Sequence, residues 1–365
     1  MAQTFNISRD FRASQPVGPA QTGALPFGIP PVQEWLALSG AGFVDVWANP
    51  FQTLNQGCFV AELHLPLPKG KVLINMRNTA LGERGFALFA APDGGLSILH
   101  RNGAAMVRVG VPPCPQGTGS RLRLTYQFNA DTRHWMIRLH PLDEQSPTVE
   151  ITGVGALPFA HKDIEDICKS TEIEPSVLWF GFSRNDSLPQ NAPWIGPRTP
   201  IQTARGTVLA GSLAVGDIVM TQDRGPVTLL GLHKLGLPAR GSFAPVLLRG
   251  PIYSKSCDVL VSASQRIVIT GGEVEYLFGT DSVLVEARNI VDGHTALADG
   301  RQDVIAAVIL DLGGAALVCG PEGKNDLTLA LGDITQTDTA PLMCLNSFET
   351  VALMRMMGRI VSKSI

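Results

Sequence analysis

The stretch TPIQTARGTVLAGSLAVGDIVMTQDRG, residues 199–225, alternates short apolar runs with turn-forming residues. Gly216-Asp217 and Asp223-Arg224-Gly225 mark the turns. Glycine adopts positive φ angles at no steric cost, and an aspartate side chain accepts hydrogen bonds from nearby backbone amides, so both residues favour tight turns. Short strands joined by such turns predict an all-β domain. We expect Asp217 and Asp223 to serve these turns rather than to act as acids.

The same pattern continues toward the C-terminus, where short apolar runs occupy residues 257–272, 275–293 and 304–320. Together with the first stretch, these segments resemble the Hint domain, the β-fold of hedgehog proteins and inteins, in its bacterial subfamily. The resemblance covers residues 194–355 and implies a Hint-like β-domain there. The residues that match the subfamily pattern are Thr199, Ile201, Thr203, Gly206, Leu213, Gly216, Asp217, Val219, Thr221, Asp223, Gly225, Leu260, Val261, Ser262, Arg266, Leu277, Phe278, Gly279, Val283, Leu284, Val285, Ala287, Val291, Asp292 and Gly293.

The resemblance also implies a reaction, the cleavage of the domain's own backbone. A cysteine at the first position attacks the preceding carbonyl, and the histidine of a T-x-x-H segment protonates the leaving nitrogen, because acyl transfer needs a nucleophile and a proton donor. The nucleophile's position falls on Trp194, whose indole has no lone pair for acyl attack. The second segment begins at Ser262 and ends at Gln265, which cannot transfer a proton near neutral pH. We therefore expect no catalytic residue at these degenerate positions and no self-cleavage.

Two further departures lie downstream. Asp311-Leu312-Gly313-Gly314 stands where the subfamily often has D-R-H-E, and the C-terminal Lys-Ser-Ile lacks the His-Asn pair of inteins. Thr199 and Thr203 lie in the right region to replace the nucleophile, but both occupy ordinary polar strand positions. Cys257 is expected to be a small buried residue. An autoprocessing Hint enzyme with an atypical nucleophile is the alternative interpretation.

The N-terminal half has a different pattern of short strands, beginning near residue 40. In residues 121–142, the alternate residues Leu122, Leu124, Tyr126 and Phe128 share one face of a strand. Asn-Ala-Asp-Thr then turns the chain, and Trp135, Ile137 and Leu139 lie on a returning strand, so the segment predicts a β-hairpin. Residues 161–170 predict a helix. Seven or more short strands favour a β-sandwich. Their order resembles the concanavalin-like jelly rolls, the lectin and laminin-G type of sandwich.

Composition shifts suggest four segments along the chain. Residues 1–35 read as an irregular N-terminal arm, residues 36–190 as the lectin-like sandwich, residues 191–355 as the Hint-like domain and residues 356–365 as a C-terminal tail. The Pro-rich stretch 187–200 would be the connector between the two domains.

Sugar recognition on such sandwiches uses an exposed aromatic platform beside polar groups. The candidate ligand-binding residues are Trp35, Trp47, Trp135 and the polar group Asn75, Arg77 and Asn78 at a loop edge. Trp179, inside VLWFGF, is expected to be core. A carbohydrate-active enzyme is a second alternative, but the close acidic pairs Glu165-Asp166 and Glu172/Glu174 resemble a solvated face rather than the carboxylates of a glycosidase.

The bulk composition excludes several classes. The 365 residues carry 29 basic and 32 acidic residues, a net charge of −3, with no basic cluster that would indicate nucleic-acid binding. The six cysteines are scattered and the histidines lack metal-ligand spacing, so we expect no metal and no cofactor. No apolar run predicts a membrane span, and the N-terminus lacks a classical signal peptide. We expect a cytoplasmic protein, or one released or surface-bound by a signal-independent route.

These observations favour a non-catalytic binding or structural protein. Its sandwich would contact a polysaccharide, glycan or surface, and its degenerate Hint domain would be a structural module. The expected partners are a glycan and either another protein or a second copy of the chain. Such a protein could be part of an appendage on a surface or on a phage-like particle, a setting compatible with this expectation.

Overall fold

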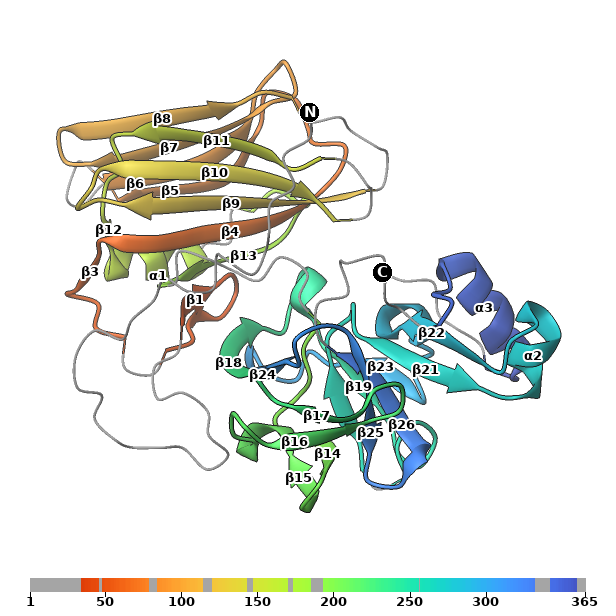
Figure 1. The fold of residues 1–365 in the computed structure, drawn as a ribbon. Helices are drawn as coiled ribbons and strands as arrows, with labels where there is room; N and C mark the ends of the chain where they lie inside the picture. Colours follow the sequence, from red (N-terminus) through yellow and green to blue (C-terminus); the bar gives the residue numbers. More distant parts are fainter. Residues whose placement is uncertain are drawn as a thin grey trace, which may run out of the picture.

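Two β-rich halves make up the fold, an N-terminal β-sandwich and a C-terminal β-domain (Figure 1). The all-β class expected from the sequence is confirmed. The computed structural model describes residues 34–45, 48–78, 84–113, 120–142, 147–169, 173–184, 193–255, 257–331 and 342–359. No helix within these ranges is long and apolar enough to cross a membrane.

The sandwich consists of a seven-stranded sheet facing a four-stranded sheet. The first has the strand order β11-β10-β9-β4-β13-β1-β2 and the second the order β5-β6-β7-β8, while β3 and β12 form a separate pair. The strands are β1 (Trp35–Leu38), β2 (Gly42–Phe43), β3 (Thr53–Leu54), β4 (Gln56–His64), β5 (Val72–Asn78), β6 (Arg84–Ala90), β7 (Leu96–Asn102), β8 (Ala105–Val111), β9 (Arg121–Asn129), β10 (His134–Pro141), β11 (Val149–Val154), β12 (Phe159–Ala160) and β13 (Val177–Ser183).

The hairpin predicted for residues 121–142 is confirmed as β9 and β10, which pair from Asn129 with His134 to Leu122 with Pro141. Leu124 and Tyr126 point into the sandwich and are wholly buried. The predicted helix is also confirmed as α1 (His161–Lys169), and its apolar side is buried at Ile164 and Ile167. Alternation of period two in the strands, and a single apolar stripe on the helix, therefore placed these side chains correctly.

Aromatic rings fill the space between the two sheets. Phe59 of β4 packs against Phe86 of β6 with ring centroids 5.0 Å apart, and Phe159 lies 5.1 Å from Phe182. All four rings are essentially buried. Removing one such ring costs about 3–5 kcal/mol of stability, so this cluster holds the two sheets together.

The C-terminal half is built on an eight-stranded sheet. Its main path is β15-β14-β16-β25-β26-β21-β22, with β17 paired to β16, and two smaller sheets, β18-β24 and β20-β19-β23, complete the half. The elements are β14 (Pro200–Thr203), β15 (Gly206–Leu209), η2 (Ala210–Ser212), β16 (Ile218–Thr221), β17 (Gly225–Thr228), β18 (Gly231–Pro238), η3 (Gly241–Phe243), β19 (Val246–Leu248), β20 (Val259–Val261), β21 (Arg266–Thr270), α2 (Gly272–Phe278), β22 (Ser282–Glu286), η4 (Ala287–Ile290), β23 (Ala296–Ala298), β24 (Val304–Asp311), β25 (Ala316–Gly320), β26 (Gly323–Leu331) and α3 (Ser347–Met356).

The turns predicted in residues 199–225 are present. Gly216 has a φ of 95° and Gly225 a φ of 70°, angles that favour glycine. Asp217 accepts a hydrogen bond from the Ala214 amide at 3.0 Å, and Asp223 accepts one from the Leu317 amide at 2.9 Å. Asp217 therefore serves its own turn, as expected, whereas Asp223 binds the backbone of β25, 94 residues further along the chain.

The two halves meet across an apolar cluster, here called the junction cluster. It forms where the outer face of the seven-stranded sheet, at β1, β4 and β13, packs against β18, η3 and β24 of the C-terminal half. In Figure 1, β1 of the sandwich lies beside β18 and β24 of the C-terminal half. Its buried members are Trp35, Leu38, Cys58, Val60, Trp179, Trp194, Leu237, Ala239, Phe243, Ile305 and Ala307.

Candidate functional site

The structure brings together Trp194 and Ser262, two of the positions that a Hint reaction would use, although 68 residues separate them. The Ser262 amide donates to the Trp194 carbonyl at 2.9 Å, and the Trp194 amide donates to Ser262 Oγ at 3.3 Å. The adjacent Ile195 holds this arrangement because it bridges Val261 and Val308 in antiparallel fashion. The backbone at this point is therefore fixed between β20 and β24.

The Trp194 side chain occupies the junction cluster. It is 3% exposed, and it joins Trp35 and Trp179 of the sandwich in one continuous apolar core. A buried indole contributes packing area and offers no nucleophile. The position expected to start self-cleavage is thus a packing position between the two halves.

Gln265 is wholly buried and its amide group is engaged with the backbone. Its Nε2 donates to the carbonyls of Arg266, at 2.8 Å, and Ala330, at 2.7 Å. Its Oε1 is buried with no hydrogen-bond partner among the described residues. An amide in this setting fastens β21 to β26 and has no proton to exchange near neutral pH.

The two candidate replacement nucleophiles are in different environments. Thr203 Oγ1 donates to the Gly206 carbonyl at 2.7 Å and accepts from the Arg205 amide at 3.2 Å, so it serves a turn. Thr199 is 3% exposed, and its Oγ1 has no hydrogen-bond partner among the described residues. Cys257, expected to be buried, is only half-buried against the C-terminal core.

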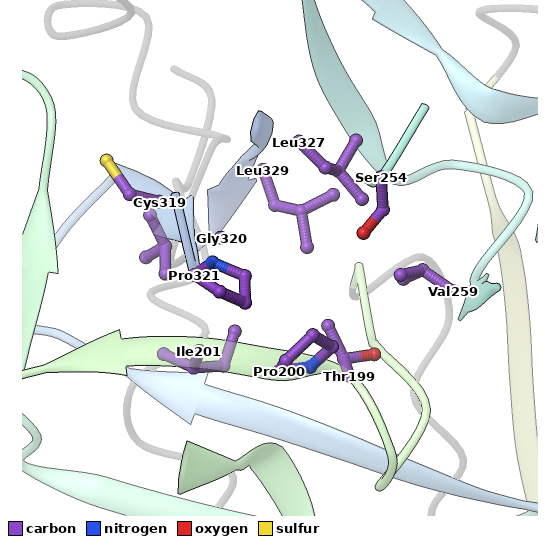
Figure 2. A pocket seen from close by; sticks show the side chains of 11 residues that line it. Thr199, Pro200, Ile201, Ser254, Val259, Cys319, Gly320, Pro321, Leu327 and Leu329 are labelled. Atoms are coloured by element: carbon purple, nitrogen blue, oxygen red, sulfur yellow. The ribbon is translucent and has the colours of Figure 1, made fainter. Parts of the chain in front are cut away.

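Thr199 borders a small pocket of about 220 Å³, which also includes open solvent. Figure 2 shows Thr199, Pro200 and Ile201 on one side and Leu327 and Leu329 on the other. The part of this volume that is enclosed among the side chains is about the size of one water molecule, which leaves no room for an organic ligand. The Cys319 sulfur is directed away from these residues in Figure 2.

A buried polar group accompanies the junction cluster. Arg123 of β9 donates its Nε to Glu62 of β4 at 3.2 Å, and the Ser242 amide of η3 donates to the other carboxylate oxygen at 2.9 Å. The Ser242 hydroxyl contacts both side chains. The Arg123 guanidinium lies over the Phe243 ring, 4.1 Å from its centroid. Burial lowers the pKa of Arg123, and the Glu62 carboxylate opposes that change.

Gly241 allows this close approach between the halves. Its φ is +55°, and an added Cβ would collide with Glu62 Oε2 and Trp179 Nε1. No side chain larger than hydrogen fits here without a shift of the buried ion pair.

The structure corrects one of the expected aromatic platforms, Trp35. Trp35 is fully buried in the junction cluster, with its ring 5.9 Å from that of Trp179, because the face that carries it is covered by the C-terminal half. Trp135 is half-buried over Gly153 and packs on the sandwich core, and its Nε1 donates to the Val154 carbonyl at 3.0 Å. Trp179 is core, as expected. Trp47 lies outside the described residues.

The polar candidates Asn75, Arg77 and Asn78 do not form a loop edge, because all three lie within β5. Asn75 is half-buried; the side chains of Arg77 and Asn78 are outside the described residues. Asn75 pairs with Ala87, Ala87 with Leu99, and Leu99 with Arg108 across the four-stranded sheet. The sequence motifs did not single out Arg101 of β7 and Arg108 of β8, although each lies at an exposed position in a strand whose other face is buried.

The acidic pairs behave as a solvated face where they are described. Glu165 forms ion pairs with Lys162 and Lys169 on the surface of α1, and Asp166 also pairs with Lys162. The hydrogen bond from Lys169 contributes most to lowering the pKa of Glu165. Glu174 pairs with Lys71, and Glu172 lies outside the described residues.

Comparison with known proteins identifies the C-terminal half. The family model described as "Hint domain" matches residues 196–310, so this half contains a Hint domain, as the sequence resemblance predicted. No curated protein matches the chain.

Three of the solved structures that resemble parts of this chain are the following. The MchDnaB-1 intein is 14% identical, with 37% of this chain and 98% of that chain covered and a TM-score of 0.24. The CBM40 module of a Ruminococcus gnavus IT-sialidase, bound to alpha2,6 sialyllactose, is 14% identical, with 37% and 79% covered and a TM-score of 0.24. A leech intramolecular trans-sialidase is 9% identical, with 55% and 40% covered and a TM-score of 0.25. Likenesses at this level say nothing about ligand or activity.

Proposed function

We propose, on the premise that residues 196–310 form a Hint domain, that this chain is a non-catalytic binding protein. In this proposal the Hint domain is a rigid support that carries a glycan-binding sandwich and does not cleave itself. The observation that carries the proposal is the burial of Trp194, at the nucleophile's position, in the apolar core that joins the two halves.

Two chemical arguments oppose self-cleavage. An acyl shift begins with attack by a side-chain thiol or hydroxyl on the preceding carbonyl, and Trp194 has neither. The leaving nitrogen then needs a proton, and Gln265 holds its amide hydrogens on two backbone carbonyls. Both functions of the reaction are missing together, so one neighbouring hydroxyl such as Thr199 would not restore it.

The junction supports a structural role for the Hint domain. Within the described ranges, eleven buried apolar residues, including three tryptophans, and the buried Glu62–Arg123 pair lie at the junction of the halves. Burying apolar surface contributes roughly 25 cal/mol per Å², so a cluster of this size opposes separation of the halves. A sandwich held in this way presents its free surface in a fixed orientation, which suits a surface or particle-bound setting.

Intact-mass analysis of the purified full chain tests the absence of cleavage. We expect one species of 38.9 kDa, with and without dithiothreitol. Thiol-dependent fragments that break immediately before Trp194 would contradict the proposal.

A polysaccharide retention assay tests the binding function. The full chain is passed over neutral and acidic polysaccharides coupled to resin, and retention of the protein on at least one of them is expected. Failure of the folded protein to bind any polysaccharide in the panel would rule out the glycan-binding part of the proposal, while the intact mass would remain an independent result.

A further inference from the structure

We propose that the outer face of the four-stranded sheet binds a polysaccharide that carries carboxylate groups, and that Arg101 and Arg108 hold those groups. The inference rests on the glycan-binding function proposed above and adds the chemical class of the ligand.

The proposed location follows from which faces of the two sheets are covered by other parts of the protein. The outer face of the seven-stranded sheet is covered at β1, β4 and β13 by the C-terminal half. In β7 and β8, Ile98 and Val107 point inward to the sandwich core, so the alternating positions Arg101, Met106 and Arg108 point outward. All three outward residues are exposed.

The charge of this sheet differs from that of the whole chain. Its four strands contain Arg77, Arg84, Arg101 and Arg108 and no aspartate or glutamate, while the chain as a whole has a net charge of −3. Arg84 is neutralised by Asp163 of α1 at 3.4 Å. Within the described ranges, neither Arg101 nor Arg108 has an ion pair. Among the side chains that the structure describes in this sheet, two positive charges therefore remain available on one face.

Local contacts hold both guanidinium groups in place. Arg108 lies over the Phe89 ring, 5.6 Å from its centroid, and Arg101 donates its Nε to the Gly103 carbonyl at 3.1 Å. A guanidinium stacked on a ring keeps its N–H groups free at its edge, where a planar carboxylate accepts two parallel hydrogen bonds. Arg101 is opposite Met106, so Arg108 is its diagonal neighbour, and such neighbours are roughly 7–8 Å apart.

The surface beside the arginines suits a sugar chain. The row Asn75, Ala87, Leu99 and Arg108 crosses all four strands, over roughly 14 Å at the usual spacing between strands. The middle of this row consists of the apolar side chains of Ala87 and Leu99, which match the C–H faces of sugar rings. At the far end, Asn75 carries an amide that both donates and accepts hydrogen bonds.

The charge count favours a sparsely charged polymer. Duplex nucleic acid carries about one negative charge per 1.7 Å, and its binding needs many basic contacts. Two unpaired arginines on a protein of net charge −3 supply too few. A polysaccharide with one carboxylate on each sugar places separate anions along a chain that is otherwise neutral and hydroxyl-rich.

The test compares binding of the full chain to polygalacturonate, dextran sulfate, dextran and single-stranded DNA by isothermal titration. We expect binding to polygalacturonate that weakens as salt is raised. Arg101→Ala and Arg108→Ala are each expected to weaken it about ten-fold, because each removes a charge-assisted pair of hydrogen bonds. Arg138→Ala is the matched control, since Arg138 lies on β10 of the other sheet and pairs with Glu150 at 2.8 Å.

Thermal unfolding of each variant separates loss of binding from loss of folding. Binding to dextran with an affinity equal to that for polygalacturonate would overturn this inference and leave the glycan-binding function standing. Stronger binding to dextran sulfate or DNA would also overturn it. Equal weakening by Arg138→Ala would show that overall charge, and not this face, determines binding.

Discussion

The Ser242 amide donates a hydrogen bond to the buried carboxylate of Glu62 at 2.9 Å, across 180 residues of sequence and from one half of the molecule to the other. The same carboxylate is paired with Arg123, and both of these charged side chains are almost inaccessible to solvent. The halves are therefore joined by a buried polar contact as well as by an apolar cluster, and this joint can be tested at single positions.

Removal of the carboxylate should strongly destabilise the protein. Glu62→Ala leaves Arg123 buried without its partner, which typically costs about 3–5 kcal/mol. Guanidinium-induced unfolding measures the change in free energy. Glu150→Ala is the control, because its pair with Arg138 is partly exposed and such pairs contribute roughly 1 kcal/mol or less. Equal losses from both variants would show that the buried pair has no special role at the joint.

Gly241→Ala should destabilise more than Gly225→Ala. Both glycines have positive φ angles, +55° and +70°, so both substitutions carry a backbone penalty of roughly 1 kcal/mol. At Gly241 the added methyl group also meets Glu62 and Trp179, whereas at Gly225 nothing lies within 4 Å. The extra loss of unfolding free energy in Gly241→Ala measures the cost of the steric contact between the halves. Equal losses in the two variants would contradict such a contact.

Trp194→Ala should destabilise the protein by about 3–5 kcal/mol, the usual cost of deleting a buried tryptophan side chain. Trp194→Phe should lose less, because a ring still fills much of the space. Chemical unfolding followed by tryptophan fluorescence and by circular dichroism gives both values. A loss below about 1 kcal/mol for the alanine variant would place the indole outside the cooperative core.

Installing the nucleophile alone should not produce cleavage. Trp194→Cys supplies a thiol beside Ser262, but Gln265 cannot protonate the leaving nitrogen. We expect this variant to retain a mass near 38.9 kDa with dithiothreitol present, and any fragments to appear only when Gln265→His is added. Cleavage in the single variant would show that another residue provides the proton.

His100 should make the stability of the sandwich depend on pH. It is stacked on Phe159 with ring centroids 3.9 Å apart, and burial lowers its pKa from 6.5 to about 3. Below pH 6.5 the unfolded chain therefore binds a proton that the folded chain does not. Stability falls as the pH decreases through this range, by at most about 1.4 kcal/mol per pH unit, and the penalty is absent above it.

Urea unfolding between neutral pH and pH 4 measures this slope. His100→Phe, which keeps an aromatic ring against Phe159, should flatten it. His64→Gln, at the exposed end of β4, should leave it unchanged. A slope that survives in the His100 variant would assign the pH dependence to other groups.

Local patterns in the sequence predicted much of the fold. The alternation in residues 121–142 predicted the β9–β10 hairpin, and the spacing of Ile164 and Ile167 predicted α1. The succession of short apolar runs from residue 199 to residue 320 resembled the Hint domain, whose family model matches residues 196–310. Trp194 and Gln265 could also be assigned to the expected nucleophile and histidine positions, because those positions follow from fixed distances along a motif. These features depend on residues that are close together in the chain, so the order of the residues is enough to predict them.

Exposure was decided by the tertiary structure. Trp35 could be placed on a strand from its neighbours, but its burial depends on η3, β18 and β24, which follow far later in the chain and pack on that face. The exposure of Arg101 and Arg108 has the same origin, since among the described residues the C-terminal half packs on the seven-stranded sheet and not on the strands that carry them. A strand's alternation distinguishes its two faces, and only the assembled fold determines which of them meets water.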